Sequence, residues 1–203
     1  MKELPQNQDL DLIFVIDKSG SMWGSEEDTM GGFNAFIEKE KNKEFNTKVT
    51  TILFNDGYEV LYERKAIEDV DELTSREYFV GGSTALLDAI GRTITSLNHK
   101  IENKALFVVM TDGMENSSVE YSKKQIKNRI SSHSWEFIFI GADIDSYNEA
   151  GSIGFKKSRI ANYEKSKNGI DDAYCSVAYA ADTMRNNMDL DYSDWDAKLR
   201  KYD

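Results

Sequence analysis

Residues 11–21 read DLIFVIDKSGS, an apolar run that ends in a carboxylate and is followed by a turn with two hydroxyls. The apolar run 12–16 predicts a strand that is buried on both faces, as in a parallel sheet. Ligands of open α/β sheets bind beyond the carboxyl ends of such strands, where Asp17, Ser19 and Ser21 are expected. Their alternate spacing lets three oxygen donors converge, and Mg²⁺ prefers oxygen donors. The stretch therefore predicts the start of a divalent-cation site.

A second segment places a hydroxyl at the entrance of a helix. Thr84 follows the glycine pair 81–82 and directly precedes an apolar pattern with spacings of three and four residues. The apolar positions of this pattern are Leu86, Leu87, Ile90, Ile94, Leu97 and Ile101. We therefore expect Thr84 to lie at the start of a helix, after a flexible loop.

A third segment adds another carboxylate. Asp112 follows the apolar run 105–110 as Asp17 follows the first run, so neighbouring parallel strands would present two carboxylates side by side. Together, D-x-S-x-S at 17–21, a Thr after two glycines and T-D-G at 111–113 resemble the metal-ion-dependent adhesion site of von Willebrand factor type A domains. All five positions of that pattern are present.

The resemblance implies roles for these residues. In the family, the hydroxyls corresponding to Ser19, Ser21 and Thr84 bind the metal directly, whereas Asp17 and Asp112 act through water or bind it alternately. The metal implied is Mg²⁺, with Mn²⁺ or Ca²⁺ as alternatives. Such a metal keeps much of its charge and an open position, for which an Asp or Glu of a partner protein is the natural ligand. The expected function is metal-dependent protein binding without catalysis.

Strands and helices alternate along the chain, which predicts an α/β fold with a doubly wound, mostly parallel sheet of about six strands and helices on both faces. An Asn-Asp-Gly turn at 55–57 between runs 49–54 and 58–62 predicts a hairpin, and therefore one antiparallel edge strand. Further strands are expected at 135–140 and near 158–160. Helices are predicted from Ser25 to Lys43, over 86–101, from Ser117 through Ile130, over 145–150 and from Ile170 to Met188.

Length and composition favour one domain. The chain has 203 residues, of which 40% are hydrophobic, and it contains one Pro. We expect a single domain over 9–190, an N-terminal extension over 1–8 and a polar C-terminal tail over 191–203. The resemblance covers about residues 9–190, and the chain is similar to short cytoplasmic type A domains of bacteria and phages.

Charge and cysteine content limit the partners and the location. A net charge of −11 argues against nucleic-acid binding, which depends on clustered Lys and Arg. The sequence lacks an apolar stretch of the ~20 residues that a membrane span needs, so we expect no membrane partner. The single Cys175 agrees with a reducing compartment, and we expect the protein in the cytoplasm. The oligomeric state is left open.

Two other interpretations of the motif remain. Asp17 and Asp112 could cap turns while the hydroxyls satisfy backbone groups. The other alternative is a Mg²⁺-dependent phosphatase with Asp17 as nucleophile. Such enzymes need an acid two residues after the nucleophile, where this chain has Ser19, and a lysine near a later strand, which the sequence does not locate.

Several residues near the motif have two interpretations each. Trp23 is expected either at the rim of the site or as a staple packed on the first helix. Glu115 and Asn116 could belong to the outer shell of a metal, or could simply make a loop polar. Asp88 could accept from a ligand hydroxyl, or could be a first-turn carboxylate favoured by the helix dipole.

Overall fold

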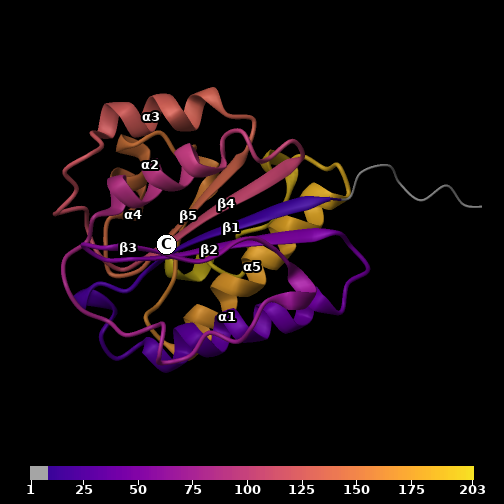
Figure 1. Ribbon diagram of the computed structural model, residues 1–203, viewed down its shortest axis with the longest axis horizontal. Helices are drawn as coiled ribbons and strands as arrows, with labels where there is room; N and C mark the ends of the chain where they lie inside the picture. Colours follow the sequence, from indigo (N-terminus) through magenta and orange to yellow (C-terminus); the bar gives the residue numbers. More distant parts are fainter. Residues whose placement is uncertain (1–8) are drawn as a thin grey trace, which may run out of the picture.

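The computed structural model describes residues 9–203 and contains a six-stranded sheet with helices on both faces (Figure 1). The N-terminal extension expected at 1–8 lies outside the described residues. The strands are β1 (Leu10–Asp17), β2 (Thr47–Phe54), β3 (Tyr58–Ala66), β4 (Lys104–Thr111), β5 (Glu136–Gly141) and β6 (Ile160–Asn162). The α-helices are α1 (Glu26–Lys41), α2 (Leu86–Leu97), α3 (Lys123–Ser132), α4 (Ser146–Ser152) and α5 (Lys167–Arg185). Short 3-10 helices are η1 (Gly20–Met22), η2 (Ile67–Asp69), η3 (Lys157–Arg159), η4 (Leu190–Tyr192) and η5 (Arg200–Tyr202).

The strand order is β3-β2-β1-β4-β5-β6. Only β3, at one edge, runs antiparallel to its neighbour, and the other pairs of this sheet are parallel. The predicted doubly wound sheet with one antiparallel edge strand is therefore confirmed. The order places β1 and β4 side by side in the centre, with Ile16 opposite Met110.

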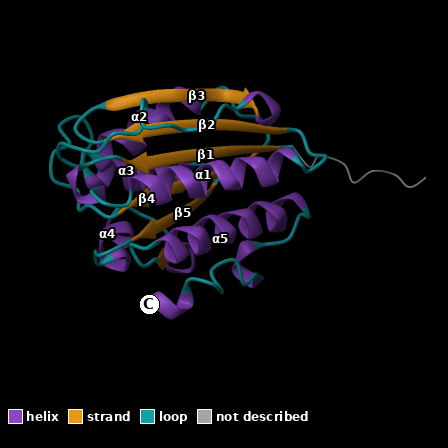
Figure 2. Ribbon diagram, turned by 90° about the horizontal axis from the view of Figure 1, so that it is seen from below, coloured by secondary structure: helices purple, strands orange, loops and turns teal. Residues whose placement is uncertain are grey.

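Each face of the sheet has its own apolar cluster, because successive side chains of a strand point to opposite faces. In β1, Leu12, Phe14 and Ile16 pack towards α1 and α5, whereas Ile13 and Val15 pack towards α2 and α3. Figure 2 shows α1 and α5 running side by side along one face. Burial of β1 on both sides explains its uninterrupted apolar sequence.

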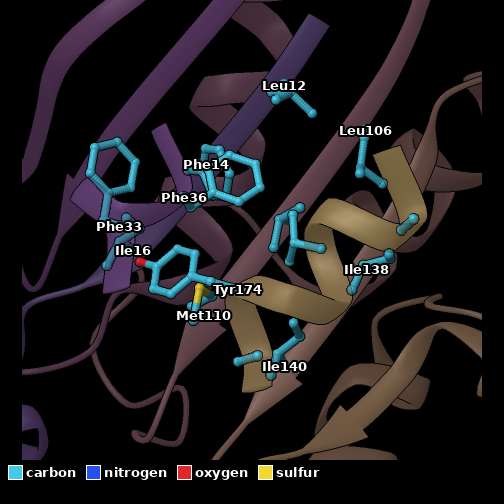
Figure 3. Packing of buried hydrophobic residues seen from close by; sticks show 14 of the residues in the cluster. Leu12, Phe14, Ile16, Phe33, Phe36, Leu106, Met110, Ile138, Ile140 and Tyr174 are labelled. Atoms are coloured by element: carbon cyan, nitrogen blue, oxygen red, sulfur yellow. The ribbon is translucent and has the colours of Figure 1, made fainter. Parts of the chain in front are cut away.

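Aromatic rings fill the centre of the α1–α5 face (Figure 3). The ring centroid of Phe14 lies 5.6 Å from that of Phe33, 5.2 Å from that of Phe36 and 6.3 Å from that of Tyr174. The first two pairs meet edge to face, an arrangement that favours aromatic rings beyond simple burial. Such packing requires α1 to approach α5 closely, and Gly32 lies at the point of contact.

The helix predicted from Ser117 begins later than expected. It starts at Lys123, and its capping box is formed by Ser122 and Gln125 rather than by Ser117 and Glu120. Asp88 explains the difference, since its carboxylate accepts hydrogen bonds of 2.8–2.9 Å from the N–H groups of residues 119–121. Those N–H groups therefore have the Asp88 carboxylate as acceptor and need no helix to satisfy them. Asp88 thus holds this loop in place and does not accept from a ligand hydroxyl.

The last helix ends at Arg185, so the prediction that it reaches Met188 is wrong. Asn187 has a φ of 56°, the left-handed conformation that commonly follows a helix C-terminus. Lys104 also donates a hydrogen bond to the carbonyl of Met184 at 2.7 Å, which satisfies one of the free carbonyls of the last turn. Met188 is consequently exposed.

Residues 191–203, which the sequence predicts to be a polar tail, pack on the domain. Trp195 and Leu199 are buried in the cluster beneath α1 and α5. The Trp195 indole N–H donates to the carbonyl of Ser158 at 2.9 Å, which ties the segment to η3, just before β6. Among residues 9–203, we find no helix long and apolar enough to cross a membrane.

Two adjacent glycines of α1 should respond to alanine in opposite ways. A Cβ on Gly32 would lie 2.7 Å from Cδ2 of Tyr174, so Gly32→Ala is expected to lower the free energy of unfolding by about 1–3 kcal/mol. Gly31 has no neighbour within 4 Å of such a Cβ, so Gly31→Ala should raise it by about 0.5–1 kcal/mol through helix propensity. Urea denaturation of both variants tests this, and equal effects would contradict the close approach of the two helices.

Candidate metal centre

Asp17 is the last residue of β1, and its side chain is fully buried at the carboxyl edge of the sheet. Its Oδ2 atom accepts a hydrogen bond from the Thr111 hydroxyl at 2.5 Å, and its Oδ1 atom accepts one from the Ser19 N–H at 2.6 Å. Thr111 is the last residue of β4. The pairing of two strands therefore fixes the orientation of this carboxylate.

The serine hydroxyls of the first loop lie together, with 2.9 Å between the Oγ atoms of Ser19 and Ser21. Their loop is tied to the glycine loop, because the Gly20 N–H donates to the carbonyl of Gly82 at 3.0 Å. Gly82 has a φ of 77°, and a Cβ there would lie 2.0 Å from Oδ1 of Asp56. Only glycine fits this position, as expected for a loop held so close to its neighbours.

Thr84 is buried and held through its backbone by Asn116. The Thr84 N–H donates to Oδ1 of Asn116 at 2.9 Å, and the Asn116 N–H donates to the carbonyl of Thr84 at 3.0 Å. The next N–H, of Ala85, donates to the carbonyl of Asn55 at 2.8 Å. These contacts satisfy the backbone around Thr84. Asn116 therefore positions a hydroxyl.

Oxygens from two separate segments, residues 17–21 and Thr84, face one small space beside Gly113. A Cβ built on Gly113 would lie 2.6 Å from Oγ1 of Thr84, 2.9 Å from Oγ of Ser21 and 3.2 Å from Oδ2 of Asp17. Ordinary carbon neighbours of a side chain do not come so close, so a side chain at position 113 would clash with these oxygens, whereas glycine lets them lie close together. Gly113 keeps this space open.

Asp112 completes the set beside Gly113. Its carboxylate is buried, and neither oxygen has a hydrogen-bond donor among the described residues. The Nζ atom of Lys165 nevertheless lies 2.7 Å from Oδ2, which is an ion-pair distance. A buried carboxylate is costly without an opposite charge, so Asp112 is suited to a cation, and Lys165 supplies one at Oδ2.

The donor set fits a hard divalent cation. No three His, Cys, Asp or Glu side chains of residues 9–203 gather into a metal site, so hydroxyls must supply the donors beyond two carboxylates. The available oxygens belong to Asp17, Ser19, Ser21, Thr84 and Asp112. An all-oxygen set of this kind favours Mg²⁺, Mn²⁺ or Ca²⁺ over metals that prefer nitrogen or sulfur.

Burial raises the pKa of Asp17 to about 6, because loss of water disfavours the charged carboxylate. Hydrogen bonds from Thr111 and Ser19 oppose this shift, and the nearby charge of Asp112 adds to it. A cation at this position would favour the ionised carboxylate and lower this pKa.

The five residues singled out from the sequence thus lie at one edge of the sheet, Asp17 at the end of β1, Ser21 in η1 and the other three in loops. Asn116, named from the sequence as a possible outer-shell residue, holds the backbone of Thr84. Two contributors were missed, which are Thr111 as a donor to Asp17 and Lys165 beside Asp112. Thr111 lies inside the T-D-G motif, which was a signal for it. Lys165 is remote in sequence and had no local signal.

The fold and the site define an α/β domain with an oxygen-lined centre at the carboxyl edge of its sheet. The family model described as "von Willebrand factor type A domain" matches residues 11–173, and the chain belongs to this family. No curated protein gives a significant match to the sequence.

Solved structures agree on the fold. Proximal thread matrix protein 1 from the mussel byssus is 17% identical with a TM-score of 0.65, covering 85% of this chain and 46% of its own. A further structure of that mussel protein has a zinc-occupied MIDAS motif, with 16% identity, a TM-score of 0.62 and coverage of 81% and 43%. The pilus adhesin SpaC from Lactobacillus rhamnosus GG is 14% identical with a TM-score of 0.69, covering 91% of this chain and 31% of its own. This chain therefore spans less than half the length of these proteins, and identities so low show the shared fold alone.

Asp17 should make the stability of the metal-free protein depend on pH. Its pKa is raised from 3.8 to about 6 on folding, so its contribution to stability is present below the unfolded value and is lost as the pH rises through about 6. Between pH 5 and pH 7 in EDTA, the wild type should lose about 1 kcal/mol relative to Asp17→Asn. Urea denaturation at both pH values measures this difference, and parallel behaviour of the two proteins would contradict the raised pKa.

Proposed function

We propose that this chain is a non-catalytic, divalent-metal-dependent protein-binding module of a short cytoplasmic type. Asp17, Ser19, Ser21, Thr84 and Asp112 would hold Mg²⁺, with Mn²⁺ or Ca²⁺ as alternatives. The partner would be another protein that supplies an Asp or Glu carboxylate. Neither nucleic acid nor a membrane is part of the proposal.

The observation that carries the proposal is the convergence of oxygens beside Gly113. Thr84 belongs to a different loop from Asp17 and Ser21, yet an oxygen of each of the three lies within 3.2 Å of the Cβ position of Gly113. The plainer interpretation, in which each polar group only satisfies its own loop, does not account for this convergence. The buried carboxylate of Asp112, which already attracts the Lys165 ammonium, points to the same conclusion.

The chemistry follows from the donors. A divalent metal bound largely by neutral hydroxyls keeps much of its charge and accepts a carboxylate at an open position. The residues of the chain hold their oxygens ready: Thr111 orients Asp17, and Asn116 orients Thr84. Donors that are oriented before binding lose little conformational entropy when a ligand arrives.

The surface around the site favours a protein partner over a free small ion. Trp23, Phe79 and Met114 are 76%, 60% and 58% exposed, and they lie in the loops that carry the proposed ligands. Such exposure shows that Trp23 is not a buried staple on α1. Large exposed apolar side chains grouped around a polar centre are typical of protein-binding surfaces.

One observation bears on the phosphatase alternative. Lys165 is a lysine beside the carboxylates, of the kind that the sequence alone did not locate. The position two residues after Asp17 is still Ser19, so the acid that would protonate a leaving group is missing. Release of phosphate from an aryl phosphate, abolished by Asp17→Asn, would reverse this ranking.

Metal binding tests the site directly. Chelator-stripped protein should bind one Mn²⁺ ion in a titration followed by electron paramagnetic resonance of the free metal. Thr84→Ala and Ser21→Ala each remove a donor, and Gly113→Ala fills the shared space, so each should weaken binding about tenfold or more.

Ser83→Ala is the matched control, because Ser83 is an exposed hydroxyl next to Thr84. It should bind Mn²⁺ as the wild type does. A saturable site that is unaffected by all three site variants would place the metal elsewhere and sink the proposed ligand set.

Partner binding should depend on the same residues. Immobilised protein in Mg²⁺ is expected to retain a partner that EDTA releases and that Thr84→Ala fails to retain, because the partner carboxylate binds through the metal. Mass spectrometry of the eluted proteins, with Ser83→Ala as control, measures this. Retention that survives both EDTA and Thr84→Ala would refute a metal-bridged contact.

A further inference from the structure

Lys165 brings a positive charge into the centre from a distant part of the chain. It lies in the loop between β6 and α5, immediately before the N-cap residue Ser166. Its Nζ atom lies 2.7 Å from Oδ2 of Asp112 and donates a hydrogen bond to the backbone carbonyl of Ser21. The ammonium group therefore bridges two of the three loops that form the proposed metal site.

The surroundings give this ammonium a specific electrostatic role. The Asp112 side chain is 1% exposed and that of Lys165 is 22% exposed, so water screens the pair weakly. Lys18 also lies near the site, but its ammonium pairs with Glu59 at 2.6 Å. Among the ion pairs of residues 9–203, Asp112 is paired with Lys165, and Asp17 is paired with no cationic side chain.

We propose that Lys165 is a tethered cation that competes with the divalent metal for Asp112. The inference rests on the proposed metal site and adds a residue that sets its affinity. A metal near Asp112 and an ammonium group 2.7 Å from the same carboxylate repel each other, so each lowers the affinity of the site for the other.

Two consequences follow from this competition. In the metal-free protein, Lys165 compensates the buried charge of Asp112 and stabilises the fold. When metal binds, the ammonium group leaves Asp112 and becomes accessible to solvent. The metal-free state is therefore an ordered state of the domain, and the metal must displace a built-in competitor.

The test compares Lys165→Gln, Lys165→Arg and the control Lys167→Gln with the wild type. Lys167 is an exposed lysine two residues further on, so Lys167→Gln removes the same charge from the same region. In Mn²⁺ titrations, Lys165→Gln should bind about tenfold more tightly, within the usual range of coupling between two binding events. Lys165→Arg keeps the charge and should stay near the wild type, as should Lys167→Gln. In EDTA, only Lys165→Gln should melt at a clearly lower temperature.

A second measurement uses the wild type alone and does not depend on the folding of a variant. Acetylation of lysines by acetic anhydride, read by mass spectrometry, should modify Lys165 faster in saturating Mn²⁺ than in EDTA. The rate at Lys167 should not change.

The outcomes separate this proposal from the proposed function. Mn²⁺ binding by the wild type, with unchanged or weaker binding by Lys165→Gln or equal acetylation in both conditions, overturns the competition and leaves the metal site standing. A saturable site present only in Lys165→Gln supports the competition. No saturable site in either protein overturns both.

Discussion

The pairing of β1 with β4 is the constraint on which the centre of this domain depends. Neighbouring parallel strands end at the same edge, so this pairing brings Asp17 close to the residues that follow Thr111, independently of the loop conformations. Two buried carboxylates repel each other and lose hydration, so this edge would destabilise the fold if it were left uncompensated. The Thr111 hydroxyl compensates Asp17, and the Lys165 ammonium compensates Asp112.

In the loops around the centre, the residues that offer oxygens to a ligand differ from the residues that hold them in place. Thr84 offers a free hydroxyl to the shared space, while the contacts that hold its backbone come from Asn116. The Glu115 carboxylate likewise accepts hydrogen bonds from the N–H groups of Ser117 and Ser118, at 3.0 and 2.8 Å. Orienting groups whose own polar atoms are satisfied do not compete for a ligand, which keeps the centre selective for its few free oxygens.

The local pattern of apolar residues was sufficient to predict the central strand and helix, because it directly reflects which side chains are buried. The uninterrupted apolar run before Asp17 follows from helices on both faces of β1, and the spacing of Leu86 and Ile90 follows from the face that α2 buries. The D-x-S-x-S pattern predicted the neighbourhood of the site because one short loop carries all of it.

The remaining features depend on contacts that no local window contains. The start of α3 is set by Asp88, thirty-odd residues upstream, whose carboxylate binds three N–H groups that would otherwise join a helix. Lys165 reaches Asp112 only because β6 lies at the far edge of the sheet and the chain returns to the centre before α5. Burial of Trp195 escaped notice for a similar reason, since the polar residues around it predict a solvated segment.

The position of Trp195 and Leu199 in the core has a consequence for how the domain is made. Synthesis proceeds from the N-terminus, so β1 to β6 and α5 leave the ribosome before residues 190–202, which pack beside α5 and β6. Until Leu199 has emerged, the nascent domain keeps an apolar surface in contact with water. Chains in that state are bound by chaperones or aggregate more readily than the finished fold. The domain therefore cannot cover this surface before Leu199 is available to dock.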